Sequence, residues 1–519
     1  MKKKLVSIIM ILQIVIAAAL CGCTGGTTDD GAGLGVNTEA DSSVSYGGKI
    51  TVGITQDLDS LDPHKAVAAG TKEVLINIFD GLIKVGSDGS FVPAVASFYE
   101  ISQDGTKYDF VLRKGVKFHN GKEVTAEDVI YSLKRVAGLD DAPDPEVLVE
   151  SAFSVIKEIN KTENGIEVIL SEPATELIGF FTCSIIPCDY DAQASAPVGC
   201  GPFKFVSYEP MRKIVLEKNE DYYVEGVPFL DGVTFKISAD TDAAFLELMA
   251  GGIDIFPYLT ADQANQLRSQ YTIECGTMNL VQALFLNNAR APFDNVKVRQ
   301  AVCYALNRKG ILDVVSEGKG EIIGTNMFPT FSRYYDASLV DRYPTDISMA
   351  RKLLGEAGYE NGISFTITVP SNYDFHVKTA EVIVEQLKAA GIEAKIKLVE
   401  WSSWLSDVYA GRDFDSTIIG LDSDLAPSDI LRFYPSDSGK NFINYSSSEF
   451  DELFEKAKRT ADETQKTALY KKLEAILTED AASAYIQSPA QLVAVNKKLK
   501  GYTFYPVYVQ DMSTVYYVK

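Results

Sequence analysis

Carboxylates cluster in the stretch Gly420-Leu421-Asp422-Ser423-Asp424-Leu425-Ala426-Pro427, and Asp429 follows closely. A carboxylate attracts a cationic group, and the attraction strengthens when a closing cleft excludes water and lowers the local dielectric constant. The same acids could instead only solvate and shape an exposed turn. Two interpretations therefore stay open, a cation-binding loop and a solvated acidic turn.

The sequence lacks the patterns of the common hydrolytic and phosphate-handling sites. It contains no Gly-x-Ser-x-Gly elbow, no HExxH helix and no phosphate-cradling glycine loop. The three histidines, His64, His119 and His376, are few as general bases and too scattered in sequence to suggest a metal-ligand cluster. We expect no catalytic residue, no metal and no cofactor, so the chain is not expected to be an enzyme.

The elements around the acidic loop predict an α/β lobe. Apolar residues alternate over 363–369 and again over 392–398, and a helical segment over 376–390 lies between them and ends at Gly391. Such a βαβ unit implies parallel strands. A further strand over 414–420 leads into the acidic loop, and ligands of open α/β sheets sit beyond the carboxyl ends of the strands. The loop therefore lies where a site is expected.

Four more segments are predicted from local patterns. Alternation over 49–54 indicates a strand, and a helix-like stretch runs over 71–82. Thr125 and Asp128 form a capping box that predicts a helix behind them, and 402–409 is amphipathic.

The first residues are typical of an exported protein. Three lysines precede an apolar run from Ile8 to Leu20, which is shorter than the roughly 20 residues that a membrane span needs. The run ends in Leu20-Cys21-Gly22-Cys23, which resembles a bacterial lipobox with Cys23 as the lipidated residue. An ordinary signal peptide with incidental cysteines is the alternative. Residues 24–46 are rich in Gly, Thr, Asp and Ser and indicate a flexible tether.

The length and the charge limit the fold and the partners. With 519 residues and 46% hydrophobic residues, the chain is expected to fold into two or more lobes. Its formal net charge of −22 makes nucleic acid and anionic membrane surfaces poor partners. The lipid, and not the protein surface, would therefore attach it to the membrane.

The cysteines beyond the lipobox are odd in number, so at least one thiol stays free. They are Cys183, Cys188, Cys200, Cys275 and Cys303. Cys183 with Cys188 is a candidate disulfide, and buried apolar thiols are an equally good interpretation; the other pairings stay open.

A family resemblance covers nearly the whole chain after the tether. Seven short motifs carry it, in this order: Ser60–Lys65, Phe79–Leu82, Leu112–Ser132, Gly201–Phe203, Asn219 with Tyr222 and Tyr223, Phe293–Ala301, and Ala350–Tyr359. In this order and spacing they resemble the oligopeptide and dipeptide solute-binding proteins of ABC transporters, family 5.

The resemblance implies an α/β fold of the periplasmic-binding-protein type, a two-lobed class II clamp with a discontinuous first lobe and an extra peripheral domain. The expected division is a signal peptide at 1–22, a tether at 23–46, a peripheral domain at 68–197 and lobe II at 276–489. Lobe I takes the remaining segments, 47–67, 198–275 and 490–519.

The resemblance also implies ligand-binding residues. Asp424 matches the acidic position that pairs with the ammonium group of a bound peptide, in the loop with Gly420, Leu421 and Asp422. A tryptophan commonly follows the loop glycine in this family, and this chain has Leu421 there, which puts the ligand class in doubt.

Further candidates lie outside the loop. Trp401 matches a pocket-lining position, with core packing as the alternative; for Trp404 core packing is preferred. Asp57 and Asp59 lie in a stretch that contacts the peptide backbone, and Tyr485 is a weaker candidate near the hinge.

These features predict an extracytoplasmic, lipid-anchored, monomeric protein that captures a short peptide and delivers it to the permease subunits of an ABC importer. The rival ligands are a nickel chelate, an oligosaccharide or another small solute. A metal chelate often needs a histidine or an arginine in the cleft, and His376 or Arg113 could serve, although both are expected at the surface.

Overall fold

The structure is a computed structural model that describes residues 44–139, 144–423 and 426–519. The predicted signal peptide, Cys23, most of the tether and Asp424 lie outside the described residues. Among the helices that are described, none is long and apolar enough to cross a membrane.

The framework is a mixed sheet in which ten strands follow the order β17-β16-β18-β14-β19-β12-β2-β11-β10-β9, and β13 and β15 also pair with β19. The strands are β2 (Lys49–Ile54), β9 (Phe203–Glu209), β10 (Lys213–Lys218), β11 (Gly232–Ile237), β12 (Ile255–Phe256), β13 (Tyr271–Thr277), β14 (Leu280–Leu286), β15 (Gly320–Ile322), β16 (Ile363–Pro370), β17 (Ile392–Val399), β18 (Ser416–Asp422) and β19 (Ser483–Asn496).

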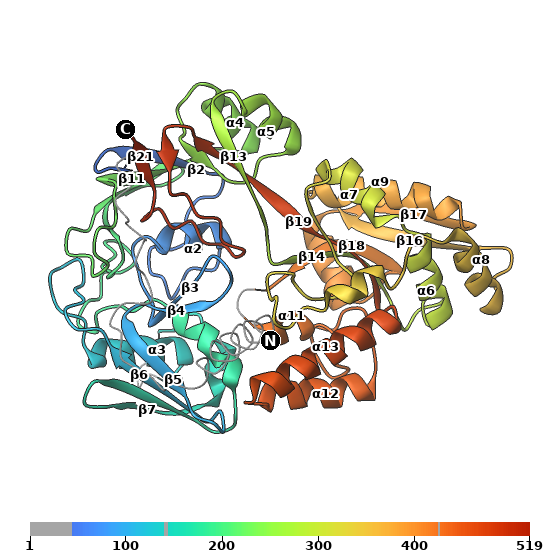
Figure 1. Cartoon of the computed structure of the whole chain (residues 1–519), viewed down its shortest axis with the longest axis horizontal. Coiled ribbons are helices and arrows are strands. Elements are labelled where there is room, and N and C mark those ends of the chain that lie inside the picture. The colour runs from blue at the N-terminus through green and yellow to red at the C-terminus, as the bar shows by residue number, and fades with distance from the viewer. Residues whose placement is uncertain (1–43, 140–143, 424–425) are drawn as a thin grey trace, which may run out of the picture. The chain divides into compact units, whose positions relative to one another are not determined.

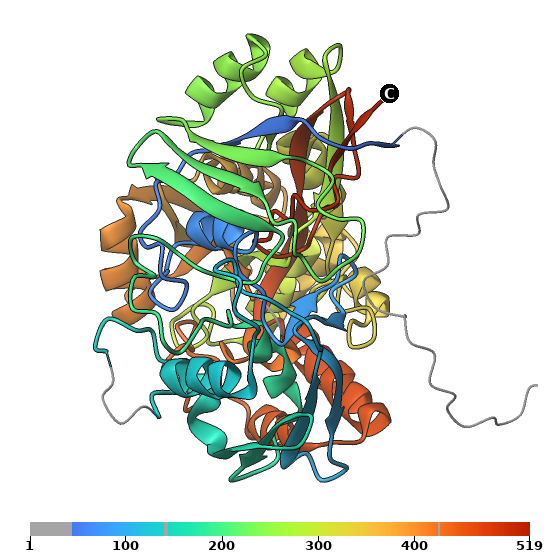
Figure 2. The same ribbon diagram turned by 90° about the vertical axis from the view of Figure 1, so that its left-hand side faces the viewer.

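The predicted first strand is confirmed as β2. Its alternate residues Ile50, Val52 and Ile54 are buried in one hydrophobic cluster. β2 runs parallel to β11, and β11 is antiparallel to β10. Figure 2 shows the blue strand of β2 beside these green strands.

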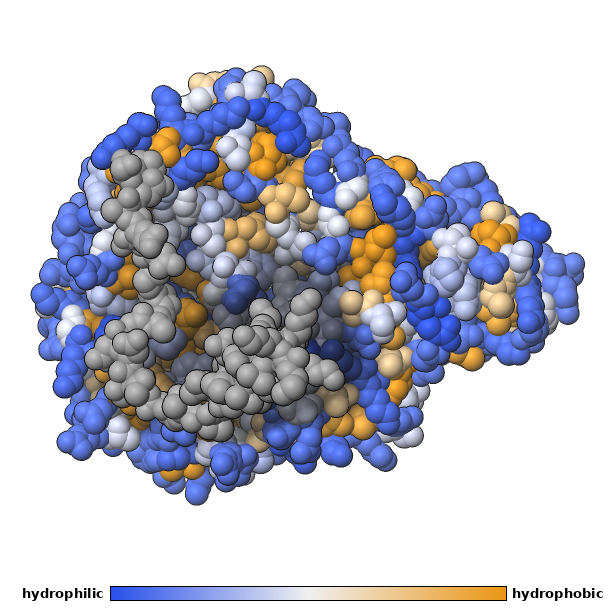
Figure 3. Space-filling model, viewed as in Figure 1, coloured by the Kyte–Doolittle hydropathy of each residue, from blue (hydrophilic) through white to orange (hydrophobic). Residues whose placement is uncertain are grey.

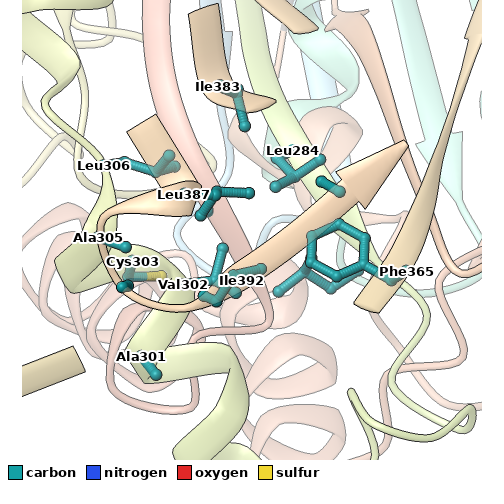
Figure 4. Packing of buried hydrophobic residues seen from close by; sticks show 14 of the residues in the cluster. Leu284, Ala301, Val302, Cys303, Ala305, Leu306, Phe365, Ile383, Leu387 and Ile392 are labelled. Carbon is teal, nitrogen blue, oxygen red and sulfur yellow. The ribbon is translucent and has the colours of Figure 1, made fainter. Parts of the chain in front are cut away.

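The predicted βαβ unit is also confirmed. β16 and β17 are parallel, with Ile363 opposite Ile392, and α9 (Asp374–Lys388) connects them. Gly391 adopts a φ of +81°, a conformation that favours glycine after a helix. The helix and both strands bury Ile383, Leu387, Ile392 and their neighbours in a common core (Figure 4). The strand predicted over 414–420 is confirmed as β18, which ends two residues later than expected and runs parallel to β16.

One long strand connects the two halves of the sheet. β19 pairs with β14 from Ser483 to Gln487 and with β13 from Ala490 to Asn496. The segment that joins β13 to β14 crosses beside it, since the Ser488 hydroxyl of β19 donates to the Met278 carbonyl at 2.8 Å. Figure 1 shows β19 running from the half with β2 to the half with β16 and β17. Two neighbouring segments therefore connect the halves here.

A separate antiparallel sheet lies within the first half, in the order β5-β6-β8-β7. The predicted helix behind Thr125 is confirmed as α3 (Ala126–Ala137), with both hydrogen bonds of the capping box formed. α3 packs on this sheet in its own hydrophobic core. The strands are β5 (Ala96–Ile101), β6 (Lys107–Leu112), β7 (Ile156–Lys161) and β8 (Gly165–Leu170).

The helix predicted over 71–82 is shorter in the structure, where α2 spans Ala69–Leu75. The amide of Asn77 donates to the carbonyls of Glu73 and Val74 and so satisfies the last turn. Beyond it, a Cβ on Gly81 would lie 2.6 Å from the backbone of Thr182, so the chain must pass that backbone closely. The carbonyls of Asn77 and Ile78 accept the backbone N–H groups of Phe203 and Gly201, both at 2.9 Å, so the chain after α2 is bound to a distant segment, which sequence periodicity does not reveal.

The remaining helices cover the sheets or fill the loops. They are α4 (Thr241–Met249), α5 (Ala261–Leu267), α6 (Val296–Ala305), α7 (Arg308–Ser316), α8 (Ile347–Glu356), α10 (Trp401–Ser403), the π-helix η4 (Trp404–Ala410), α11 (Pro427–Leu431), α12 (Ser448–Arg459), α13 (Glu463–Glu479) and the 3-10 helices η1 (Ser151–Val155), η2 (Thr175–Thr182) and η3 (Ala337–Asp341). Short strands complete the description: β1 (Val44–Ser45), β3 (Ile83–Val85), β4 (Phe91–Pro93), β20 (Leu499–Lys500) and β21 (Tyr516–Val518).

Candidate functional site

A cavity of about 590 Å³ lies between segments of the two halves of the sheet. Its volume is within the range of small-molecule sites, roughly 300–1,000 Å³. One wall comes from the first half and the C-terminal tail, through residues of 63–85, 136–184 and 507–509. The other wall comes from the end of β18 and from α11, through Asp422, Asp429 and Arg432. The face drawn in Figure 3 is hollowed near its centre, and hydrophilic side chains gather in the visible part of the hollow.

The second wall begins where β18 ends. Gly420 and Leu421 lie within β18; a Cβ on Gly420 would lie 2.8 Å from the Leu280 side chain, and Leu421 is buried in the core. Asp422 is the last residue of the strand, and its side chain is exposed to the cavity. The strand therefore places the carboxylate of Asp422 in the cavity and the side chain of Leu421 in the core.

Partial desolvation by the surrounding walls raises the pKa of Asp422, and the nearby carboxylate of Asp429 adds to the shift. A hydrogen bond with Tyr508 from the C-terminal tail and the charge of Arg432 only partly oppose this. Asp422 is thus a carboxylate whose negative charge is incompletely compensated by the protein.

Asp429 and Arg432 form an ion pair one turn apart on and after α11. Ser423 donates its hydroxyl to Asp429 at 2.8 Å, which ties both ends of the acidic loop together. The Nε of Arg432 is buried and has no hydrogen-bond partner among the residues that the structure describes. This wall therefore carries charges of both signs that are only partly satisfied.

The first wall holds a buried ion pair. Lys84 contacts Asp80 at 2.6 Å, and their side chains are 11% and 0% exposed. The hydroxyls of Tyr222 and Tyr223 donate to the other Asp80 oxygen at 3.1 and 2.8 Å. Although burial opposes its charge, the carboxylate of Asp80 raises the pKa of Lys84, so the pair stays ionised. The carboxylate of Asp80 and the ammonium group of Lys84 therefore bind groups of the protein and have little capacity left for a ligand.

A second buried group on this wall connects the turn before α2 with α3. Arg135 binds Asp62 through both Nη atoms, at 3.0 and 2.7 Å. Burial lowers the pKa of His64 to about 4, so its ring is neutral. Its Nε2 donates to the Ser184 carbonyl at 2.8 Å, and its Nδ1 accepts from Arg135 at 3.0 Å. Both ring nitrogens are therefore occupied.

Apolar side chains complete the first wall. They come from α2 and the turn after it, from β3, α3, η1 and the loop before it, and from η2, and include Leu75, Ile76, Phe79, Ile83, Val136, Leu148, Phe153 and Phe180. This wall offers apolar surface to a ligand, whereas the second wall offers carboxylates.

Of the predicted ligand residues, only Asp422 lines the cavity, and Asp424 lies outside the described residues. Asp57 accepts from the Tyr208 hydroxyl at 2.7 Å and from the Met211 amide at 2.9 Å. Asp59 accepts from the amides of Val67 and Ala68 at 2.8 and 2.9 Å. Both carboxylates thus hold neighbouring loops, and neither is among the residues that line the cavity.

The aromatic candidates pack in the second half of the molecule. Trp401 stacks on Trp404 with ring centroids 5.1 Å apart, and Trp404 is buried and donates to Thr417 at 2.9 Å. Core packing is therefore correct for Trp404, and Trp401 is half-buried against it. Tyr485 is buried, and its hydroxyl donates to Tyr434 at 3.2 Å. Neither Trp401 nor Tyr485 is among the residues that line the cavity.

The expected surface position of His376 is wrong. The side chain is buried beneath β14, and its Nδ1 accepts from the Gln282 amide at 2.8 Å. Arg113 is half-buried and donates to the Ala94 carbonyl at 3.1 Å. Across the described ranges, no group of three His, Cys, Asp or Glu side chains is arranged to hold a metal ion.

The five cysteines after the lipobox are all free thiols in the structure, including the candidate pair Cys183 and Cys188. Cys183 lines the cavity, and burial raises the pKa of its thiol to about 12. The thiol is therefore protonated and packs as an apolar group.

Sequence reasoning missed several residues of the cavity, notably Lys84, Arg432 and Tyr508. Lys84 lies two residues after the Phe79–Leu82 motif, and Arg432 lies three residues after Asp429, so proximity to these segments was a usable signal. Tyr508 comes from the C-terminal tail, and nothing local in the sequence indicates that the tail returns to this wall.

Comparison with known proteins assigns the family. Residues 90–442 match the family model of the bacterial extracellular solute-binding proteins, family 5 Middle. The oligopeptide-binding protein AppA of Bacillus subtilis is 27% identical over 546 aligned residues, covering 98% of this chain and 97% of that protein. The heme-binding protein A of Haemophilus influenzae is 29% identical over 80% of this chain and 82% of that protein.

Solved structures agree with this fold. The periplasmic binding protein DppA from Helicobacter pylori, in complex with the peptide STSA, is 28% identical with a TM-score of 0.73, and the match covers 92% of this chain and 99% of that chain. AppA from Bacillus subtilis, in complex with a nonapeptide, is 25% identical with a TM-score of 0.71 over 92% of this chain and 100% of that chain. The predicted two-lobed clamp is thereby confirmed. The chain belongs to the bacterial extracellular solute-binding proteins of family 5 and is a substrate-binding transport protein, not an enzyme.

Proposed function

We propose that this chain is the extracytoplasmic, lipid-anchored substrate-binding component of an ABC importer and that it captures short peptides between two closing lobes. The observation that carries the proposal is the cavity itself, with incompletely compensated carboxylate charge on one wall and apolar side chains on the other. A peptide offers both complements, an ammonium terminus and apolar side chains.

The acidic edge, formed by Asp422 and Asp429 of the second wall, is together with Asp424 the proposed ammonium site. The raised pKa of Asp422 means that the protein alone stabilises its charge poorly, and a ligand cation would supply the missing compensation. Asp424 follows two residues later and is the family position for this contact. We propose that Asp422 and Asp424 share the ammonium group, with the backbone of Gly420 and Leu421 nearby. Trp401, Asp57, Asp59 and Tyr485 would act indirectly, by supporting the elements around the cavity.

Relatives support peptides as the ligand class. AppA is named as an oligopeptide-binding protein and was solved with a nonapeptide, and DppA was solved with the peptide STSA. The heme-binding relative at 29% identity supports the second candidate, the same clamp with a non-peptide solute. A chelate held by histidine is less favoured, because both ring nitrogens of the cavity residue His64 are already used.

We propose the lobe division given above: lobe I from 47–67, 198–275 and 490–519, a peripheral domain at 68–197 and lobe II at 276–489. The crossing of β19 and of the β13 to β14 connection supports a hinge near 276–280 and 488–490. The closed lobes would present the ligand to permease subunits, and the protein would act as a monomer.

Calorimetry tests the peptide proposal. Titration of the purified, refolded protein with a pool of di- to hexapeptides should release or absorb heat at submillimolar concentration, and no binding at millimolar concentration would contradict the proposal. Mass spectrometry of the protein as purified distinguishes the second candidate, because a co-purifying non-peptide solute would favour it.

The anchor has its own test. Replacement of Cys23 by Ala removes the thiol that would carry the lipid, so the protein should leave the membrane fraction on detergent-free washing. Retention of the Cys23→Ala protein in the washed membranes would contradict lipid anchoring.

A further inference from the structure

A carboxylate from the first half of the molecule contacts the second half at the end of the acidic loop. Glu176 lies in η2, and its Oε2 accepts the backbone N–H of Ser428 at 3.1 Å. Its Oε1 accepts the hydroxyl of Tyr470 in α13. A single side chain therefore binds two elements of the other half, α11 and α13.

The Ser428 contact satisfies a group that α11 cannot satisfy itself. Ser428 is the second residue of this helix, and the first backbone N–H groups of a helix have no partner within it. Ala426, before the helix, makes no capping hydrogen bond with its side chain. Glu176 thus takes the place of a local cap, and a hydrogen bond to an ionised carboxylate is stronger than a neutral one.

The partner on α13 is rigid. Tyr470 is fully buried, and its ring packs edge-on against Tyr334 with centroids 5.3 Å apart. Nearby, Arg459 of α12 lies 3.7 Å from Glu172, but both side chains are more than half exposed, so that pair is weak. Glu176 is therefore the strong contact of this region, and Glu172 is a natural control.

The same short helix also faces the cavity. Phe180 and Thr182 of η2 line the first wall, whereas Asp422 and Asp429 line the second. Asp429 follows Ser428 directly and is held by the hydroxyl of Ser423. The contact of Glu176 with Ser428 therefore fixes the distance between η2 and the acidic edge.

We propose that Glu176 is a positioning residue: it docks η2 on α11 and α13 and thereby holds the acidic edge, Asp422 and Asp429, in place for the ligand. The effect of Glu176 on ligand affinity rests on the proposed function, whereas its contact with α11 and α13 does not. Loss of the carboxylate frees the Ser428 amide and loosens the acidic edge.

Hydrogen exchange read by mass spectrometry at residue resolution tests the contact without any peptide. In Glu176→Ala the Ser428 amide should exchange about tenfold faster or more, because its partner is lost. Glu176→Gln keeps one acceptor oxygen and should give an intermediate rate. Glu172→Ala should leave the rate unchanged. An unchanged Ser428 rate in Glu176→Ala would overturn the proposal.

If Glu176→Ala does not fold, Tyr470→Phe offers a second test. This variant removes one of the two hydrogen bonds of Glu176 and should also speed the exchange of the Ser428 amide. An unchanged exchange rate would count against the proposal in the same way.

Calorimetry with the pool of di- to hexapeptides then tests the positioning role. Affinity should fall about tenfold in Glu176→Ala, recover partly in Glu176→Gln and stay unchanged in Glu172→Ala. Faster exchange with unchanged affinity would overturn the positioning role. Absence of binding to the unaltered protein would contradict the proposed peptide function, while the exchange experiment would still decide whether Glu176 docks the two halves.

Discussion

The two walls of the cavity treat their charges differently. On the first wall, Asp80 with Lys84 and Asp62 with Arg135 are nearly excluded from solvent and bind each other at short distance. On the second wall, Asp422 is exposed and Arg432 remains 40% exposed although it contacts Asp429. In a buried, fully paired ion pair, loss of either partner is strongly destabilising, and little charge is left to bind a ligand. The difference indicates that the first wall is a charged scaffold and the second wall is the recognition surface.

The largest expected effect breaks the scaffold. Asp80→Asn leaves Lys84 buried without its countercharge, and loss of one partner of a buried pair costs about 3–5 kcal/mol. The free energy of unfolding in urea should fall by this amount. The matched control is Asp189→Asn, which breaks the solvent-exposed contact with Lys122 and should leave the unfolding free energy unchanged. Equal effects in both variants would mean that burial of the pair does not matter.

A pH experiment examines a buried acid of α2, the helix that borders the first wall. Burial raises the pKa of Glu73 in α2 to about 7, against an ordinary value of 4.5. The folded state then binds more protons than the unfolded state between these values, so stability falls as the pH rises from about 4.5 to about 7, by about 3 kcal/mol. Glu73→Gln should remove this part of the pH dependence and be more stable than the unaltered protein at pH 8. Urea unfolding at pH 5 and pH 8 measures the free energy of unfolding of both proteins. The same change between the two pH values in both proteins would contradict the raised pKa of Glu73.

The smallest effect concerns Tyr485. Its hydroxyl donates to Tyr434 in the core of the second half, so Tyr485→Phe should cost about 1 kcal/mol of unfolding free energy. Peptide affinity should not change, because the residue is outside the cavity lining. A clear loss of affinity in calorimetry would return Tyr485 to the ligand site and weaken the distinction between scaffold and recognition surface.

The sequence was sufficient for the regular elements and the family. Strict alternation over Ile363–Pro370 and Ile392–Val399 and the capping box at Thr125 depend on neighbouring residues only, and each has the predicted structure. The end of α2 was not predictable, because the carbonyls of Asn77 and Ile78 bind the backbone of Phe203 and Gly201, more than a hundred positions away.

The site was harder to predict than the fold, and the family motifs show why. His119 and Asn219 both donate to the carbonyl of Gly201 at 3.0 Å, and Arg299 donates to the Phe293 carbonyl at 2.8 Å. These motif residues bind one another or the backbone and so specify the scaffold. The cavity instead collects residues from distant segments, such as Lys84, Arg432 and Tyr508, and their meeting depends on the tertiary fold.

The central claim is that the acidic edge of the second wall recognises a peptide ammonium group. Calorimetry should compare one pool of di- to hexapeptides with the same pool after N-terminal acetylation, which removes the positive charge. We expect the unaltered protein to prefer the free-amine pool by about tenfold or more, which corresponds to about 1.4 kcal/mol. In the Asp422→Asn, Asp424→Ala double variant both pools should bind with the same weaker affinity, while melting is nearly unchanged. Equal affinity of the unaltered protein for the two pools would contradict the claim.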